Sequence, residues 1–212
     1  MARRRAKTAP PPKVTGDDVT DGRRLRSSRS RAKIVRALLT VIRSGDMTPS
    51  AARVAEVAGV SLRTVFRHFD DMDTLHREMA AIVEVEVRPI MAPPLRGETW
   101  RERLDELIGR RTQVFEHIMP YRVAGSLRRF TSTYLMQDYR KFVAMERETL
   151  LGVLPQTLIA DAMLTAALEM TTGFQAWRRM RQDQQLSAVD ARAVMLFTVD
   201  RLLAGRRDQF GQ

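Results

Sequence analysis

The chain has 212 residues, 44% of them hydrophobic, which is enough to build a core in one or two helical domains. Its 36 Lys and Arg against 25 Asp and Glu give a formal net charge of +11, which favours a polyanionic partner, nucleic acid first and an anionic membrane surface second. The absence of Cys excludes disulfides, thiolate metal sites and Cys nucleophiles.

Much of the basic excess lies at the N-terminus, where residues 1–31 contain ten Lys or Arg and three Asp. Residues 1–27 are rich in Arg, Pro, Gly and Asp without apolar periodicity, so we expect them to form a disordered basic arm. Arg26 and Arg29 are candidates for contacts with DNA phosphates or a minor groove. The alternative is a solubilising tail without a set target, and the sequence favours neither.

An amphipathic helix is expected over residues 28–44, because apolar residues recur there at separations of three and four along one stripe. A close pair of short helices follows. The first of the pair is expected to start at Thr48 as its cap and to end near Val57, and the second to start at Ser61 as its cap. Gly59 stands between them, where the left-handed conformation that a sharp turn requires costs it little.

This spacing predicts a helix-turn-helix. Once Ala55 and Val65 fill the corner between the two helices, a set of mainly polar and basic residues is left toward solvent. Arg and Thr side chains suit phosphates and base edges in a major groove, whereas the alternative is an ordinary helical hairpin with a solvated Arg face. The residues left outside are Leu62, Arg63, Thr64, Arg67 and His68.

The rest of the chain shows helical periodicity without the alternation typical of β-strands, so the predicted fold class is all-α. A fourth helix with an acidic first turn is expected to end at Arg88-Pro89, and a later one to be interrupted at Pro120. The expected divisions are a basic arm (1–27), a helix-turn-helix head (28–80), a helical body for ligand binding and dimerisation (81–205) and a tail (206–212).

The last two expected helices are apolar on more than one face, and the first of them is expected to run without a break from Ile159 to Trp177. A four-helix interface between two copies would bury the extra faces and predicts a homodimer. A fully intramolecular bundle is the alternative. The candidate interface residues are Ile159, Met163, Met170, Phe174, Val189, Ala193, Leu196, Val199 and Leu203.

The body is also rich in Met and aromatic residues, which are candidates for lining an adaptable apolar cavity, although such stripes are more often simply core. The three His have no metal-ligand companion at helical spacing and no catalytic motif is present, so we expect no enzyme, no metal and no cofactor. The candidate ligand-binding residues are Phe115, Phe130, Tyr134, Tyr139, Phe142 and Trp177.

The string GVSLRTVFRHFDDMDTL, at Gly59–Leu75, resembles the motif of TetR-type transcriptional regulators, and the resemblance covers residues 28–80. It implies a three-helix DNA-binding head, an all-helical ligand-binding and dimerising body, and repressor activity that a small molecule releases. It implies phosphate contacts for Thr48 and Ser50, base reading for Ser61, Leu62, Arg63 and Thr64, and backbone contacts for Arg67 and His68.

Two positions depart from the family pattern. Phe66 stands where many members have Tyr, and Met72 stands where Lys is common. Both changes remove a group that often reaches a DNA phosphate, so the resemblance implies fewer contacts with the DNA backbone at these two positions.

We therefore expect a cytoplasmic, homodimeric regulator that binds a pseudo-palindromic operator in double-stranded DNA and responds to a partly apolar small-molecule effector. No membrane partner is expected, because no apolar run approaches the length of a membrane span. Two other functions stay open: a sequence-neutral nucleoid-associated DNA-binding protein, and a helical scaffold or small-molecule-processing protein.

Overall fold

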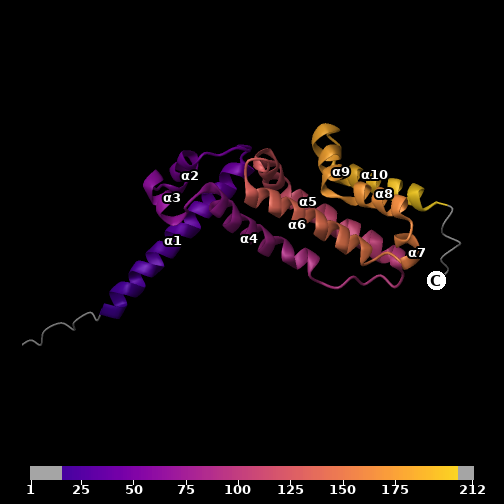
Figure 1. The fold of residues 1–212 in the computed structure, drawn as a ribbon, viewed down its shortest axis with the longest axis horizontal. Helices are drawn as coiled ribbons and strands as arrows, with labels where there is room; N and C mark the ends of the chain where they lie inside the picture. The colour runs from indigo at the N-terminus through magenta and orange to yellow at the C-terminus, as the bar shows by residue number, and fades with distance from the viewer. Residues whose placement is uncertain (1–15, 205–212) are drawn as a thin grey trace, which may run out of the picture.

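The structure, a computed structural model, describes residues 16–204, except for the side chains of residues 16–23 and Arg26. The secondary structure of residues 16–204 is helical without a β-strand, so the predicted all-α class is confirmed. Residues 1–15 of the expected arm and the expected tail 206–212 lie outside the described residues. In chain order the helices are α1 (Gly16–Arg43), α2 (Ala51–Ala58), α3 (Leu62–His68), α4 (Met72–Met91), α5 (Trp100–Arg128), α6 (Thr133–Leu151), α7 (Gln156–Ile159), α8 (Ala162–Thr172), α9 (Phe174–Arg178), a π-helical turn (Arg179–Asp183) and α10 (Ala188–Leu203) (Figure 1).

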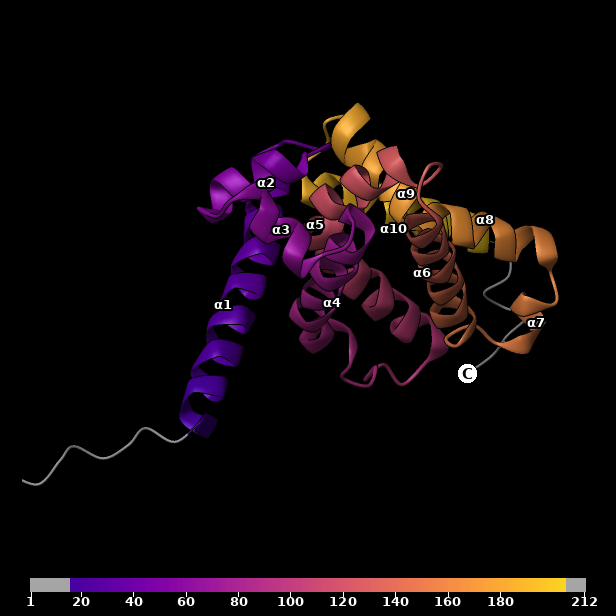
Figure 2. The same ribbon diagram turned by 60° about the vertical axis from the view of Figure 1, so that its left-hand side comes forward.

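The head consists of α1, α2 and α3, which pack together at one end of the molecule (Figure 2). Ile34, Leu38 and Ile42 of α1 are fully buried, as the apolar stripe predicts. Val54 of α2 and Val65 of α3 close the same core from the other side. Burial of each of these side chains contributes about 1.5–3 kcal/mol, so this small layer accounts for much of the cohesion of the head.

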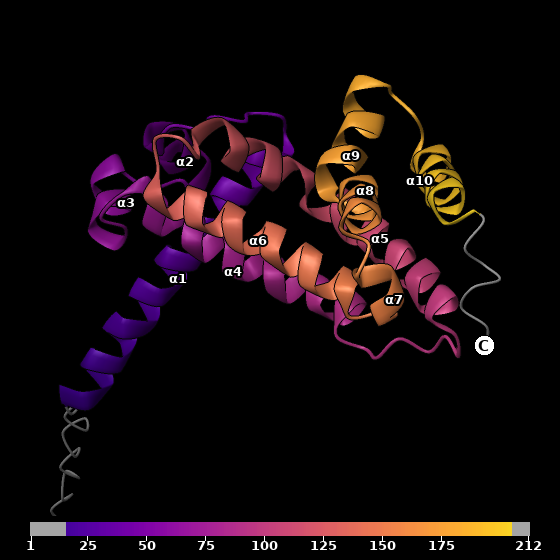
Figure 3. The same cartoon turned by 45° about the vertical axis from the view of Figure 1, so that its right-hand side comes forward.

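Helix α1 begins at Gly16, well before the predicted start at residue 28. Apolar periodicity marks a helix that buries one face. The early part of α1 points away from the rest of the molecule in all three views (Figures 1, 2 and 3), and its Arg24 and Leu25 are exposed. Within residues 16–27, only the stretch 23–26 (Arg-Arg-Leu-Arg) has good intrinsic helix propensity.

Two Pro residues lie inside helices instead of ending them. Helix α4 continues through Pro89 to Met91, and α5 continues through Pro120 to Arg128, which corrects both predicted breaks. A Pro in a helix interior costs about 3 kcal/mol. Beyond Pro120 the side chain of Tyr121 is buried against the core, and such burial offsets that cost.

Helix α5 is the central helix of the body. It starts with a capping box between Thr99 and Glu102, and α4, α6, α9 and α10 all pack against it (Figure 3). At its middle, the ring of Phe115 meets Phe174 edge-on at 5.6 Å, and Phe174 meets Phe142 in the same way at 6.1 Å. Within residues 16–204, no helix is both long and apolar enough to cross a membrane.

The predicted unbroken helix from Ile159 to Trp177 is divided into α7, α8 and α9. Gly173 has an extended backbone (φ −85°, ψ 163°) and separates α8 from α9. The main-chain N–H of Phe174, which starts α9, donates to Glu146 Oε1 of α6 at 2.7 Å. This side chain from another helix satisfies an N–H that has no partner within α9, and so stabilises a break that periodicity alone does not reveal.

A buried arginine lies beside this break. Arg111 of α5 is 4% exposed and donates to Thr172 Oγ1 at 2.9 Å, to Thr149 Oγ1 at 2.7 Å and to the carbonyl of Glu146. Burial lowers the pKa of Arg111 to about 10. Burial also raises the pKa of Glu146, whereas the hydrogen bond from the Phe174 N–H and the charge of Arg111 act to lower it. The network joins α5, α6 and α8 in the interior of the body.

Candidate nucleic-acid interface

Helix α2 starts two residues later than predicted. Ser50 is its cap, with a side chain that accepts from the main-chain N–H of Arg53 at 3.1 Å. Thr48, the predicted cap, lies exposed in the preceding loop, where its N–H donates to Asp46 Oδ1 at 3.2 Å. The hydroxyl of Ser50, and not that of Thr48, accepts from a free N–H of the first turn, so the helix begins two residues further along the chain.

The turn between α2 and α3 has the predicted chemistry. Gly59 is left-handed (φ 60°, ψ 43°), and its N–H is directed at the carbonyls of Ala55 and Glu56. Ser61 caps α3 as predicted and accepts from the N–H of Thr64 at 3.1 Å. The hydroxyl groups of Ser61 and Thr64 also lie 2.9 Å apart, so both are fixed at the first turn of α3.

Arg31 of α1 holds the other end of α3 in place. Its Nε donates to Glu78 Oε1 of α4 at 2.7 Å, it donates to the carbonyl of His68, and its guanidinium lies 4.3 Å from the centre of the buried Phe69 ring. Sequence reasoning missed this role because Arg31 sits in an Arg-rich stretch. The available signal was its spacing, three residues before Ile34 on the buried stripe of α1.

The outer face of α3 carries two unpaired cations. Arg63 and Arg67 are exposed, and neither makes a hydrogen bond or ion pair with the described part of the chain. Leu62 and Phe66, 44% and 50% exposed, lie on the same helix. With the two hydroxyl groups at its first turn, α3 offers guanidinium donors, hydroxyls and apolar surface on one short element, the set of groups that contacts phosphates and base edges.

His68 is placed differently from the arginines. Its side chain is half-buried, and its Nε2 is buried without a hydrogen-bond partner in the described residues. Burial, followed by the charges of Arg67 and Arg31, lowers the pKa of His68 below its ordinary value. The Nε2 atom of His68 therefore does not face solvent, and the expected phosphate contact gains no support from its position.

The remaining candidates for DNA contact lie on α1 and at the start of α2. Thr48 and Ser50 are exposed, and Arg29 is exposed on α1, two residues before Arg31. The side chain of Arg26 lies outside the described residues, although the main chain at this position is helical.

The six aromatic candidates for ligand binding differ in burial. Burial separates them into core side chains, half-buried rings and one ring that is 76% exposed, Phe130. Arg129 lies over both Phe130 and Tyr139, at 4.8 and 4.1 Å from the ring centres. The core side chains are Phe115, Phe142 and Trp177, and the half-buried rings are Tyr134 and Tyr139.

The candidate interface residues also divide by burial. Phe174, Val199 and Leu203 are buried within the core of one chain. A stripe at helical spacing identifies an apolar face without telling which neighbour covers it, and here α5 and α8 cover part of it. The half-buried members are Ile159 and Leu196, and the exposed members are Met163, Met170, Val189 and Ala193.

No protein-family model and no curated protein matches this chain. Solved structures do match it. A transcriptional regulator from Rhodococcus sp. is 21% identical with a TM-score of 0.62, over 82% of this chain and 96% of that one. A protein titled a transcriptional regulator from Pseudomonas aeruginosa is 18% identical with a TM-score of 0.63, over 85% and 93%. A further Rhodococcus protein, titled as TetR-family, is 21% identical with a TM-score of 0.54, over 84% and 100%. The chain therefore has the fold of these regulators, as the resemblance implied.

Proposed function

We propose that this chain is a sequence-specific, DNA-binding transcriptional regulator of the TetR type, and that α3 enters the major groove. The observation that carries the proposal is the pair of unpaired guanidinium groups of Arg63 and Arg67 on a short exposed helix. The Gly59 turn fixes one end of that helix and Arg31 the other. Such preorganisation lowers the entropy cost of contact with base edges.

The proposed regulator acts as a homodimer. Exposed apolar side chains lie on α8 and α10: Met163 is 86% exposed, Met170 74% and Phe197 59%. Large apolar side chains gathered on two neighbouring helices favour a protein partner. Two heads related by a two-fold axis read a pseudo-palindromic site with half-sites one or more helical turns apart.

The regulator is proposed to respond to a small molecule, with repression as the default state. Glu86 of α4 supports this coupling because its Oε2 accepts from Arg43 of α1 at 3.2 Å and lies 2.7 Å from His117 Nε2 of α5. One carboxylate thus joins the head to the central helix of the body. A ligand that favours another position of α5 displaces the head and weakens operator binding.

The test starts with selection of a preferred duplex from genomic fragments by the full-length chain. Fluorescence anisotropy then compares this duplex with a scrambled one. Arg63→Ala is expected to cost about 1–3 kcal/mol on the selected duplex and to reduce discrimination, whereas Arg29→Ala weakens binding to both duplexes and flattens the salt dependence. The control is Arg88→Ala, an exposed cation of α4 that pairs with Glu84, and it leaves both affinities unchanged.

Two outcomes contradict the proposal. Equal binding of selected and scrambled duplexes by the wild-type chain supports a sequence-neutral nucleoid-associated protein. A complete lack of DNA binding at low salt, together with turnover of a bound small molecule, supports a scaffold or small-molecule-processing protein.

A further inference from the structure

A groove of about 410 Å³ lies between α5 and α10, apart from the predicted aromatic cluster except for Trp177. Gly109 and Gln113 of α5 line it on one side, and Arg192 and Leu196 of α10 on the other. The volume falls in the range of small-molecule sites, which are mostly apolar with a few convergent polar groups. The groove is thus of a size to hold one small organic molecule.

Arg192 is a cation at this groove that has no counterion among the described residues. Its side chain is exposed and makes no hydrogen bond or ion pair within residues 16–204. The guanidinium lies close over Gly109, since a Cβ added at Gly109 would come within 3.2 Å of Arg192 Nη2. The missing side chain at Gly109 therefore lets the cation of α10 lie across the wall of α5.

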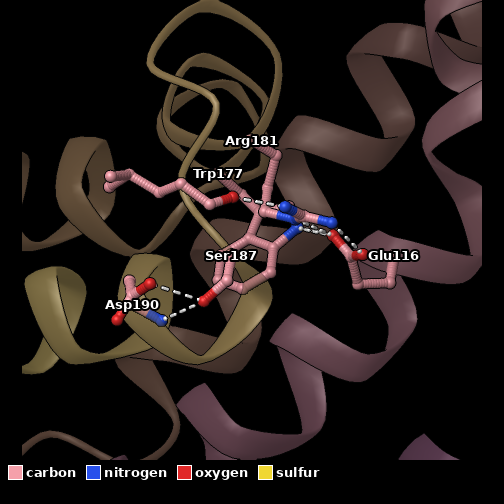
Figure 4. Close-up of polar contacts among 6 residues, drawn as sticks. Glu116, Trp177, Arg181, Ser187 and Asp190 are labelled. Atoms are coloured by element: carbon pink, nitrogen blue, oxygen red, sulfur yellow. Dashed lines mark hydrogen bonds and ion pairs between the residues drawn. The ribbon is translucent and has the colours of Figure 1, made fainter.

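The one carboxylate that lines the groove is already neutralised. Glu116 Oε1 accepts from Trp177 Nε1 at 2.8 Å and from Arg181 Nε at 2.8 Å, and Oε2 accepts from Arg181 Nη2 at 2.9 Å (Figure 4). These bonds from Arg181, ahead of the one from Trp177, lower the pKa of Glu116, so it stays ionised and paired. Arg181 also donates to the carbonyl of Leu186, just before α10, which fixes this wall.

We propose that the groove binds a small aromatic anion, a carboxylate or sulfonate whose charge pairs with Arg192 and whose ring lies against Leu196 and the other apolar side chains of α10 that line the groove. Gln113 is exposed and has no partner in the described residues, so its amide provides a second donor for the anionic group. That the bound anion acts as the effector rests on the proposed regulatory function. Binding of the anion to the groove can be measured without DNA.

The probes are anilinonaphthalene sulfonate and its uncharged analogue phenylnaphthylamine, which share one aromatic skeleton and differ in the anion. The full-length wild-type chain is expected to bind the sulfonate about three- to tenfold more tightly than the analogue. Arg192→Gln removes this preference and leaves the affinity for the analogue unchanged. The matched control is Arg201→Gln, an exposed cation of the same helix that lies over Phe197 and does not line the groove, and it changes neither affinity.

The location is tested with Trp100→Phe, which leaves Trp177 as the one tryptophan of the chain. Quenching of Trp177 by the sulfonate, shifted to higher sulfonate concentration in Arg192→Gln as the preference is lost, supports the groove. Equal affinities for the two probes, or equal losses in Arg192→Gln and Arg201→Gln, overturn it. If either of these two results is obtained while the chain still discriminates between selected and scrambled duplexes, the groove proposal fails and the proposed DNA-binding function is unaffected. Anion binding without such discrimination rejects the regulator and retains the groove.

Discussion

Ser132 Oγ donates to Asp73 Oδ2 at 2.7 Å, between the start of α6 and the start of α4. Ser132 also caps α6, because its hydroxyl accepts from the N–H of Leu135 at 3.0 Å. Asp73 lies in the first turn of α4, directly after the helix proposed to read DNA. The start of α6 is thereby attached to the first turn of α4, the helix that follows α3 in the chain.

Loss of this attachment is expected to cost stability. Ser132→Ala removes both a cap and the bond to Asp73, and should lower the free energy of unfolding by about 1–2 kcal/mol. In a double-mutant cycle with Asp73→Ala, urea denaturation should give a coupling of about 0.5–1.5 kcal/mol. Ser187→Ala, which removes the cap of α10, is the control and should combine additively with Asp73→Ala. Additivity of the Ser132 and Asp73 variants would contradict the link.

Stability should depend on pH through His76. This side chain is 2% exposed with both ring nitrogens unpaired in the described residues, and its pKa is lowered to about 4, first by burial and then by Arg128, with Asp73 opposing. The folded-state pKa lies below the unfolded value of 6.5, so the contribution is fully present above about pH 6.5 and is lost as the pH falls toward about 4. The loss is on the order of 3 kcal/mol.

The check is urea denaturation of the wild type and of His76→Leu at about pH 7 and about pH 4.5. The stability of His76→Leu relative to the wild type should rise as the pH falls, because Leu needs no desolvation of a proton-binding group. Parallel pH profiles of the two proteins would show that His76 is not the source of the dependence.

The buried network around Arg111 should be sensitive to the loss of its cation. Arg111→Met is expected to cost about 3–5 kcal/mol, because the partly buried Glu146 carboxylate loses a compensating charge. Thr172→Val removes one hydroxyl partner and should cost about 1 kcal/mol. Addition of Glu146→Gln to Arg111→Met should recover part of the loss in thermal or urea unfolding. A further loss in the double variant would mean that packing, not charge, dominates at this position.

The exposed face of α8 and α10 should control assembly. Phe197→Asp is expected to convert a dimer into a monomer in gel filtration with light scattering, with an unchanged helical signal in circular dichroism, because Phe197 is 59% exposed within one chain. Val85→Asp is the matched control: Val85 is 58% exposed on α4, away from the proposed face, and its variant should stay dimeric. A wild-type monomer at micromolar concentration would reject this interface.

Local rules predicted the parts of the fold that local chemistry controls. The Gly59 turn, the Ser61 cap and the stripe through Leu38 each depend on a few neighbouring residues. The breaks that were mispredicted depend on distant groups. Helix α5 passes through Pro120 because the following turn is buried, and the chain bends at Gly173 with a carboxylate from another helix at the bend.

The same division applies to the sites. The exposure of Arg63 and Arg67 followed from the helix-turn-helix spacing. The groove between α5 and α10 could not be predicted from the sequence. It joins Gly109 and Arg192, which lie far apart in the chain and meet through the packing of α5 on α10. Aromatic content predicted six other ligand-binding candidates, and it could not show which of them lie in the core, because composition carries no information on burial.

The early part of α1 is continuous with the portion that is locked into the head by Ile34 and Leu38. Its direction is therefore rigidly tied to that of α3. At 1.5 Å per residue, the stretch from Gly16 to Arg29 forms a lever about 20 Å long. A rotation of the head by about 10° moves the far end of this lever by about 3 Å, the length of a hydrogen bond. A small reorientation of the head thus becomes, at the tip of the lever, the difference between a made and a broken polar contact.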